Sequence, residues 1–191
     1  CFCCPPNLVR TIAEVSGWAY SLSENGVAVN LYGGSELDTR LADDTPLKLT
    51  QDTEYPWKGL VNITIQECKD SPFEILFRIP GWAEDAKVRL NGEDAGIDIE
   101  AGTFARMERV WKPGDVISID MPMKITLVEG HPRIEEVRNQ VALKRGPIVY
   151  CVESPDLPQG TEILDVYIDG NTELRTEHRP DFLGGVSIIK G

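Results

Sequence analysis

Three of the chain's five cysteines lie within its first four residues, in the stretch CFCCPPN. A thiolate is both a preferred soft ligand of zinc and the reactive, nucleophilic form of cysteine. A disulfide between the neighbours Cys3 and Cys4 would close a strained ring far from the preferred geometry. A closed structural zinc site needs four donors and a catalytic site normally three, so further donors must come from elsewhere. The spacing alone therefore indicates a reactive or metal-bound thiol.

A helix is predicted directly after these thiols, over residues 5–23. Apolar residues recur near helical spacing from Leu8 to Tyr20, and two prolines suit a first turn whose N–H groups need no partners. Asn7 is the expected N-cap. Backbone N–H groups at the start of a helix stabilise an anion, so this position favours a thiolate.

The other cysteines and the two histidines offer no obvious further ligands. Cys68 and Cys151 lie in apolar, strand-like settings, where a free cysteine is usually a small buried hydrophobic residue. His131 and His178 lie in polar stretches without ligand spacing. We therefore expect the cysteines in the core and the histidines on the surface.

Paired carboxylates suggest a glycosidase dyad at first sight. Each pair, however, lies in a polar stretch near Gly or Pro, in a protein whose net charge is −12 at pH 7. Such clusters are ordinary surface chemistry. We interpret them as solvated turns: Asp43-Asp44, Glu84-Asp85 and Glu135-Glu136.

The composition of the chain excludes several classes of protein. The chain has 191 residues, 41% of them hydrophobic, which is enough for one large or two small cores. No basic stripe is present to neutralise phosphates, so nucleic acid is not an expected partner. No apolar run is long enough to span a membrane. An odd number of cysteines, two of them adjacent, does not fit a disulfide framework; reduced thiols favour a cytoplasmic location.

From residue 24 onward the apolar pattern has a period of two, which predicts strands. Gly and Pro turns separate them at roughly ten-residue spacing, as in antiparallel β-sandwiches rather than a parallel α/β fold. Asn91-Gly92 predicts a two-residue hairpin, and Val116–Met121 should bury Ile117, Ile119 and Met121. The predicted strands are 27–32, 46–51, 60–66, 73–79, 87–90, 103–110, 116–121, 125–128, 141–144, 148–153, 162–168 and 186–189.

We expect three regions in this all-β chain. Residues 1–23 form the helical segment, residues 24–124 a first β-sandwich, and residues 125–191 a second sandwich, or a continuation of the first, that is not necessarily complete. The sequence has no initiator Met and begins within a motif. We therefore interpret it as a fragment of a longer protein.

Several motifs together resemble one family. CCPPN at residues 3–7 is similar to an element of the β-L-arabinofuranosidases of glycoside hydrolase family 127. Four further stretches resemble the β-sandwich region of that family, in the same order, so the resemblance extends over most of the chain. They are FRIPGWA at 77–83, VRLNG at 88–92, WKPGD at 111–115 and ALKRGPIVY at 142–150.

The resemblance implies a fold, a cofactor and a mechanism. Family members carry an (α/α)6 barrel followed by β-sandwiches, so residues 1–23 would be the last motif of a barrel that is otherwise missing here. Cys3 would correspond to the nucleophile and a zinc ligand, and Cys4 to a second zinc ligand. The other ligands, a glutamate and a cysteine, and the acid/base glutamate would lie upstream.

By this resemblance the parent hydrolyses an L-arabinofuranoside-type oligosaccharide with retention, and Cys3 replaces one of the usual two carboxylates. The fragment alone should be inactive and should not retain Zn²⁺.

Two other functions remain open. The β region could be a non-catalytic carbohydrate-binding or interface module that packs on a barrel and assists a homodimer. Exposed aromatic platforms would favour it; Trp57 is the best candidate, whereas packing is expected for Trp82 and Trp111. Alternatively, Cys1, Cys3 and Cys4 could form a zinc- or redox-sensing thiol site, which would need another donor.

Overall fold

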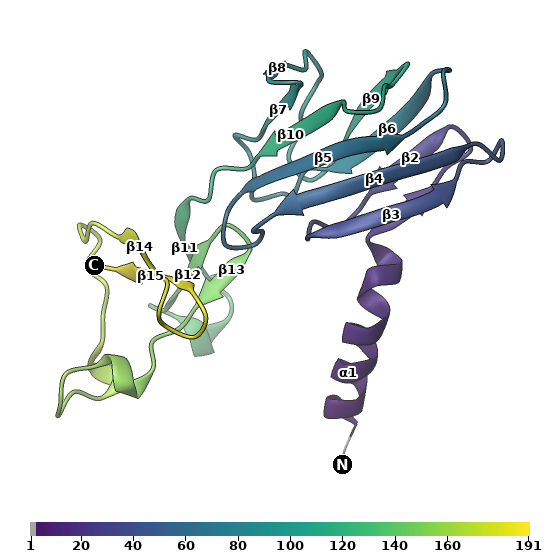
Figure 1. Ribbon diagram of the computed structural model, residues 1–191. Coiled ribbons are helices and arrows are strands. Elements are labelled where there is room, and N and C mark those ends of the chain that lie inside the picture. Colours follow the sequence, from purple (N-terminus) through teal and green to yellow (C-terminus); the bar gives the residue numbers. More distant parts are fainter. Residues whose placement is uncertain (1–2) are drawn as a thin grey trace. The chain divides into compact units, whose positions relative to one another are not determined.

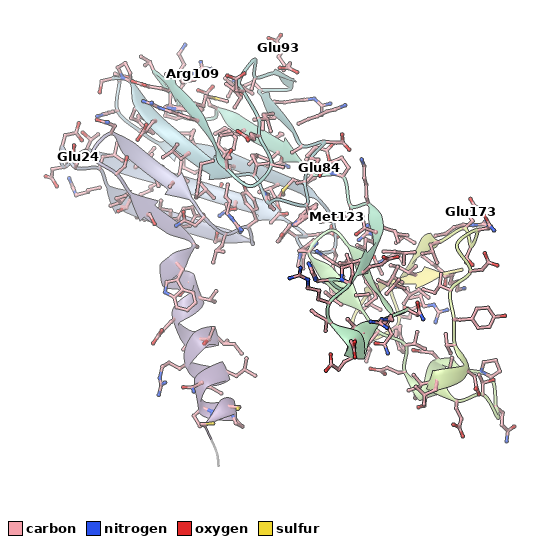
Figure 2. All side chains as sticks on the ribbon, turned by 180° about the vertical axis from the view of Figure 1, so that it is seen from behind. Glu24, Glu84, Glu93, Arg109, Met123 and Glu173 are labelled. Carbon is pink, nitrogen blue, oxygen red and sulfur yellow. The ribbon has the colours of Figure 1, made fainter. Side chains whose placement is uncertain are left out.

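The computed structural model of the protein describes residues 3–191 (Figure 1). It divides into two compact units, which we call the first unit, up to Pro122, and the second unit, Met123–Gly191 (Figure 2). No helix within the described residues has the length and apolar character needed to cross a membrane.

The predicted N-terminal helix is present but shorter than expected. Helix α1 spans Cys4–Glu14, a 3₁₀ turn follows over Val15–Trp18, and Tyr20 already belongs to a strand. The prediction of Asn7 as N-cap is wrong, because its N–H already bonds to the carbonyl oxygen of Cys3 at 3.2 Å, one helical turn back. Cys3 is the capping residue, and the two prolines occupy the first turn.

The first unit consists of two sheets. One has the strand order β1-β2-β6-β9 and the other the order β3-β4-β5-β10-β7-β8. The strands are β1 Tyr20–Leu22, β2 Gly26–Val29, β3 Ser35–Arg40, β4 Pro46–Thr53, β5 Leu60–Glu67, β6 Phe73–Arg78, β7 Lys87–Leu90, β8 Glu93–Asp94, β9 Phe104–Arg109 and β10 Val116–Asp120.

Strand pairing is antiparallel with one exception, so the predicted antiparallel β fold is confirmed. The exception is β2, which runs parallel to β6 with Gly26 opposite Glu74. A Cβ at Gly26 would lie 1.9 Å from the carbonyl oxygen of Glu74. The close contact between these two strands therefore requires glycine at this position.

Side chains from both sheets meet in one core. Ile117, Ile119 and Met121 are fully buried, as the alternation in this stretch predicted. The hairpin at Asn91-Gly92 is also confirmed, since Leu90 pairs with Glu93 and both turn residues have positive φ. The other large, fully buried side chains are Leu47, Leu49, Ile63, Ile65, Phe73, Ile75, Phe77, Ile79 and Trp111.

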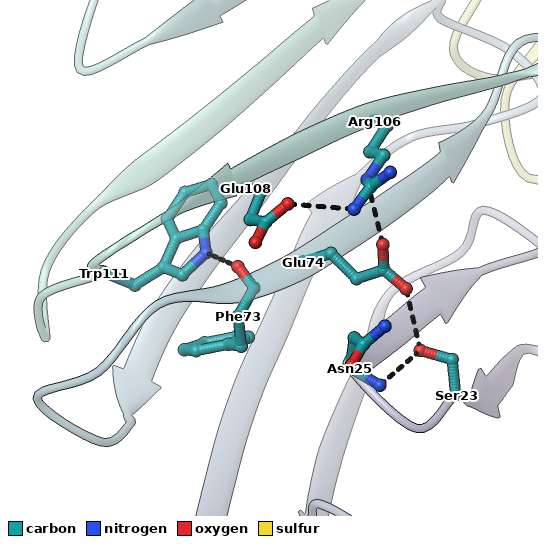
Figure 3. Close-up of polar contacts among 7 residues, drawn as sticks. All are labelled: Ser23, Asn25, Phe73, Glu74, Arg106, Glu108 and Trp111. Atoms are coloured by element: carbon teal, nitrogen blue, oxygen red, sulfur yellow. Dashed lines mark hydrogen bonds and ion pairs between the residues drawn. The ribbon is translucent and has the colours of Figure 1, made fainter.

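Trp111 anchors the end of this core. Its ring is fully buried, and its indole N–H donates to the carbonyl oxygen of Phe73 at 3.0 Å (Figure 3). The Arg109 guanidinium lies 5.5 Å from the ring centroid. The packing role expected for Trp111 is therefore confirmed.

The second unit has two small sheets, β11-β12-β13 and β14-β15. The predicted strand 162–168 is wrong: a 3₁₀ turn forms there, in which the Asp165 carboxylate accepts the Glu162 N–H at 3.2 Å. The elements are β11 Ile125–Glu129, β12 Val141–Arg145, β13 Ile148–Tyr150, β14 Arg175–Arg179, β15 Val186–Lys190 and the 3₁₀ turns Glu135–Val137, Ser154–Asp156 and Ile163–Asp165.

Candidate active site

The two described thiols of the CFCCPPN stretch lie together at the start of α1. Both are exposed, neither forms a disulfide, and their sulfur atoms are 3.7 Å apart. Cys1 lies outside the described residues. Pro5 and Pro6 have no N–H to donate, so two of the donors that usually face an anion at a helix start are missing. The helix start therefore offers fewer N–H donors to an anion than a helix start without prolines would.

The spacing of the two sulfur atoms fits a zinc ion. Two ligands at 2.3 Å on a tetrahedral zinc are separated by about 3.8 Å. The observed 3.7 Å between Cys3 and Cys4 matches that separation without rearrangement of the helix start. These two thiols can therefore supply two corners of a zinc site.

The other ligands of such a zinc site are not supplied by the described part of the chain. Between residues 3 and 191, no three Cys, His, Asp or Glu side chains come together as a metal site. Glu14, the acidic residue nearest in sequence, is ten residues beyond Cys4 in helical conformation, which corresponds to about 15 Å.

The apolar side chains of helix α1 are exposed. It has no buried residue, and Leu8, Val9 and Ile12 are each more than 60% exposed. Val15 and Trp18 in the following turn are also exposed. An isolated helix of this length is marginal in water, so its stability normally comes from packing an apolar face.

The other cysteines differ from each other. Cys68 is half-buried as a core-type residue, and its thiol donates to the carbonyl oxygen of Trp111 at 3.4 Å. Burial, with Asp70 and Asp115 nearby, raises the pKa of Cys68. The expectation that Cys151 is buried is wrong: it is exposed, because it follows the last paired residue of β13 in a unit without a core.

The histidines and the paired acids behave as surface groups. His131 and His178 are both exposed, as expected. The Lys69 ammonium hydrogen-bonds to Asp43 and lowers the pKa of that carboxyl group to about 2. A general acid in a glycosidase needs a raised pKa, so the shift at Asp43 has the wrong direction for that role. Glu135 faces Arg138 at 3.5 Å, an ordinary surface ion pair.

The structure also reveals a buried carboxylate that the sequence reasoning did not single out. Glu74 accepts a hydrogen bond from the Ser23 hydroxyl at 2.9 Å and pairs with the Arg106 guanidinium at 2.9 Å (Figure 3). Arg106 in turn pairs with Glu108 at 2.8 Å. The sequence did carry a signal for this buried carboxylate, because Glu74 is a charged residue inside the otherwise apolar stretch 73–77. With a cation and a hydroxyl as partners, Glu74 is a structural group that joins β6 to β9.

Two family models match the chain. A model described as "Beta-L-arabinofuranosidase, GH127 middle domain" matches residues 26–123, and one described as "Glycoside hydrolase family 127 C-terminal domain" matches residues 125–183. The chain belongs to glycoside hydrolase family 127. The resemblance seen in the sequence motifs is thereby confirmed. Cys3 and Cys4 precede both matched ranges.

Individual proteins similar to the chain agree with this family. The chain is 31% identical, over 99% of its length, to a non-reducing end β-L-arabinofuranosidase from Bifidobacterium longum subsp. longum. Among solved structures, a glycoside hydrolase is 41% identical with a TM-score of 0.90, and a GH127 β-L-arabinofuranosidase from Geobacillus stearothermophilus T6 is 37% identical with a TM-score of 0.89. Each comparison covers 99% of this chain.

The chain corresponds to only part of each of these relatives. It spans 29% of the Bifidobacterium protein, 31% of the glycoside hydrolase and 29% of the Geobacillus protein. More than two thirds of each relative therefore has no counterpart in this chain.

Proposed function

We propose that this chain is part of a zinc-dependent, retaining glycoside hydrolase that releases L-arabinofuranose. Membership of family 127 supports the reaction class, and the name of the Bifidobacterium relative supports the sugar. The observation that carries the proposal is the pair of exposed thiols, 3.7 Å apart, at the start of α1. Cys3 is the nucleophile and a zinc ligand, and Cys4 is a second zinc ligand.

Zinc bound by the two sulfurs would keep Cys3 deprotonated at neutral pH, where a free cysteine is only a few per cent thiolate. The Cys3 sulfur attacks the anomeric carbon, so that a C–S bond forms while the bond to the leaving oxygen breaks. A carboxylic acid outside the described residues gives its proton to that oxygen. Water, deprotonated by the same carboxylate, then displaces the sulfur and restores the thiolate with net retention.

In this proposal the rest of the chain is a scaffold. Residues 1–23 belong to the catalytic barrel, with the exposed apolar side chains of α1 packed against its other helices. Residues 24–124 are a β-sandwich domain, and residues 125–191 are a second sandwich, or a continuation of the first, that is not necessarily complete. The chain alone should neither hydrolyse the sugar nor retain zinc, because the remaining donors and the acid/base group are not among the described side chains.

The alternatives receive less support. A carbohydrate-binding module needs exposed aromatic platforms; Trp57, the best candidate, is 38% exposed, which favours this alternative, whereas Trp111 is buried and Trp82 is half-buried, which does not. A self-sufficient zinc-sensing site needs a third donor, and the described residues do not bring one to Cys3 and Cys4.

The test uses a longer protein that contains this chain, with the variants Cys3→Ala and Cys4→Ala. Cys3→Ala should lower the rate of β-L-arabinofuranoside hydrolysis by at least about 10⁴-fold, as removal of other enzyme nucleophiles does. Cys4→Ala should lose zinc as well as activity. Cys151→Ala, an exposed cysteine far along the chain, is the matched control and should keep both. Full activity in Cys3→Ala would disprove the assignment.

A further inference from the structure

The first unit contains two Asn-Gly pairs, Asn25-Gly26 between β1 and β2 and Asn91-Gly92 between β7 and β8. Asparagine side chains deamidate most readily before glycine, because the missing Cβ leaves the following backbone nitrogen open to approach. That nitrogen must reach the side-chain carbon Cγ, so the reaction needs an amide that can turn. The contacts of each amide therefore decide which pair reacts.

The amide of Asn91 is held at both ends. Its Nδ2 donates to the Asp115 carboxylate at 2.9 Å, and its Oδ1 accepts the Val116 N–H at 2.8 Å. Asp115 is only 7% exposed and also accepts the Lys112 N–H at 2.9 Å, which fixes its position. Deamidation expels Nδ2 as ammonia, so it must break the bond to Asp115, and rotation of the amide also breaks the bond to Val116.

The amide of Asn25 has no such partners. Asn25 is exposed, and its side chain forms no hydrogen bond with another residue that the structure describes. Its backbone N–H donates to the Ser23 hydroxyl at 3.3 Å (Figure 3), and its carbonyl oxygen accepts the Glu74 N–H at 3.0 Å. The backbone of Asn25 is therefore held, while its side chain is free to turn toward Gly26.

We propose that Asn25 is a deamidation site of the folded chain, whereas Asn91 is protected. The Gly26 backbone nitrogen attacks Cγ of Asn25, so that a C–N bond forms and Nδ2 leaves as ammonia with the proton that Gly26 gives up. Water then opens the resulting succinimide ring. Addition of water at the Cγ carbonyl gives aspartate, and addition at the backbone carbonyl gives isoaspartate, in which the chain runs through Cγ.

Isoaspartate at position 25 would disrupt the contact between β2 and β6. Gly26 lies so close to Glu74 that a Cβ there would be 1.9 Å from the Glu74 carbonyl oxygen, so a displaced chain has no space. Isoaspartate adds a carbon to the backbone directly before Gly26. It also turns the carbonyl group that accepts the Glu74 N–H into a carboxylate outside the chain. The start of β2 should therefore separate from β6.

The same turn helps to hold the Glu74 carboxylate, since the Ser23 hydroxyl donates to it at 2.9 Å. Deamidation of Asn25 would thus mark the age of the chain at the junction of β1, β2 and β6. All residues of this inference lie in the first unit, so it does not depend on the chemistry proposed for Cys3.

The test ages the chain 1–191 at mildly alkaline pH and follows both Asn-Gly peptides by mass spectrometry, with fragmentation that distinguishes isoaspartate from aspartate. Asn25 should convert at least about tenfold faster than Asn91, the factor expected for one hydrogen bond to a charged group. Asp115→Ala should speed conversion of Asn91 by a similar factor and leave the rate at Asn25 unchanged. In urea that unfolds the chain, the two rates should become equal.

Equal rates in the folded chain would overturn the proposal. So would an Asn25 that stays intact in the folded chain over the period in which the unfolded chain converts, because the contact of Gly26 would then block ring closure.

The structural consequence is tested on the isoaspartate form, which carries an added negative charge and separates by ion exchange. It should unfold at a lower urea concentration than the unmodified chain. Asn25→Asp, which has the same charge and a normal backbone, is the matched control and should unfold close to the unmodified chain. An isoaspartate form as stable as Asn25→Asp would overturn the proposed loss of contact between β2 and β6.

Discussion

The two units of the chain differ in how many hydrophobic side chains they bury. All twenty buried hydrophobic side chains lie between Val27 and Met121 in the first unit, and none of those described lies in the second. Ten strands in two facing sheets enclose a core, whereas a three-stranded and a two-stranded sheet do not. Helix α1 resembles the second unit in this respect, because it also buries nothing.

The difference separates structural groups from the candidate site. The self-contained sandwich carries structural groups such as Trp111 and Glu74, each with its partners inside the unit. Cys3 and Cys4 lie on the helix that the described residues leave uncovered. The chain thus combines a self-contained sandwich with two elements, α1 and the second unit, in which no described hydrophobic side chain is buried.

The largest expected effect comes from the core of the first unit. Trp111→Ala would leave a large cavity and remove the hydrogen bond to Phe73, so we expect a loss of about 3–5 kcal/mol in the free energy of unfolding. Trp57→Ala, at a 38% exposed position, should cost less than about 1 kcal/mol. Urea unfolding followed by circular dichroism measures both. Equal losses would mean that the core is not where the structure places it.

A smaller effect is expected at the ion pair between β6 and β9. Glu74→Gln removes a charge whose side chain is 10% exposed and which bonds to both Arg106 and Ser23, so it should cost about 2 kcal/mol. Glu108→Gln breaks an exposed pair with the same arginine and should cost less than about 1 kcal/mol. If the two variants unfold at the same urea concentration, burial does not strengthen the Glu74 pair.

The smallest effect depends on pH. Burial acts to raise the pKa of Asp115, but hydrogen bonds from Asn91 and Lys112 and the charges of Arg109 and Lys112 bring that pKa below its ordinary value. The folded state then binds a proton less readily than the unfolded chain. The Asp115 carboxylate therefore stabilises the folded state above about pH 4, and this contribution is lost as the pH falls below that value.

The stability advantage of the unsubstituted chain over Asp115→Asn should accordingly be larger at pH 7 than at pH 3, as measured by urea midpoints. An advantage that stays constant or grows at pH 3 would contradict this sign.

The sequence predicted correctly those parts of the fold that follow from local patterns, such as alternating apolar and polar residues or a turn-forming pair. Residues 116–121 alternate because one face is buried, and Asn91-Gly92 can adopt the backbone that its hairpin needs. The strands β3 and β14 were missed because they are polar strands at sheet edges, SELDTR and RTEHR, whose pairing comes from their neighbours. The predicted helix was too long because Tyr20 fits a helical spacing in the sequence. In the structure Tyr20 pairs with Val29 in a sheet.

The candidate thiol pair was visible in the sequence, whereas its role as a site stays a prediction. Adjacent cysteines before two prolines were visible in the sequence, and the distance between their sulfur atoms came only from the structure. Cys151 was misjudged because an apolar stretch predicts a core only when another layer covers it.

The central claim is that the Cys3 sulfur forms the covalent bond to the sugar. The most direct measurement is acid quenching of the longer protein during turnover of a β-L-arabinofuranoside, followed by mass spectrometry of the peptide that contains Cys3. We predict a pentosyl group on Cys3, absent in Cys3→Ala and retained in Cys151→Ala. A pentosyl group found on a carboxylate instead, with Cys3 unmodified, would contradict the account.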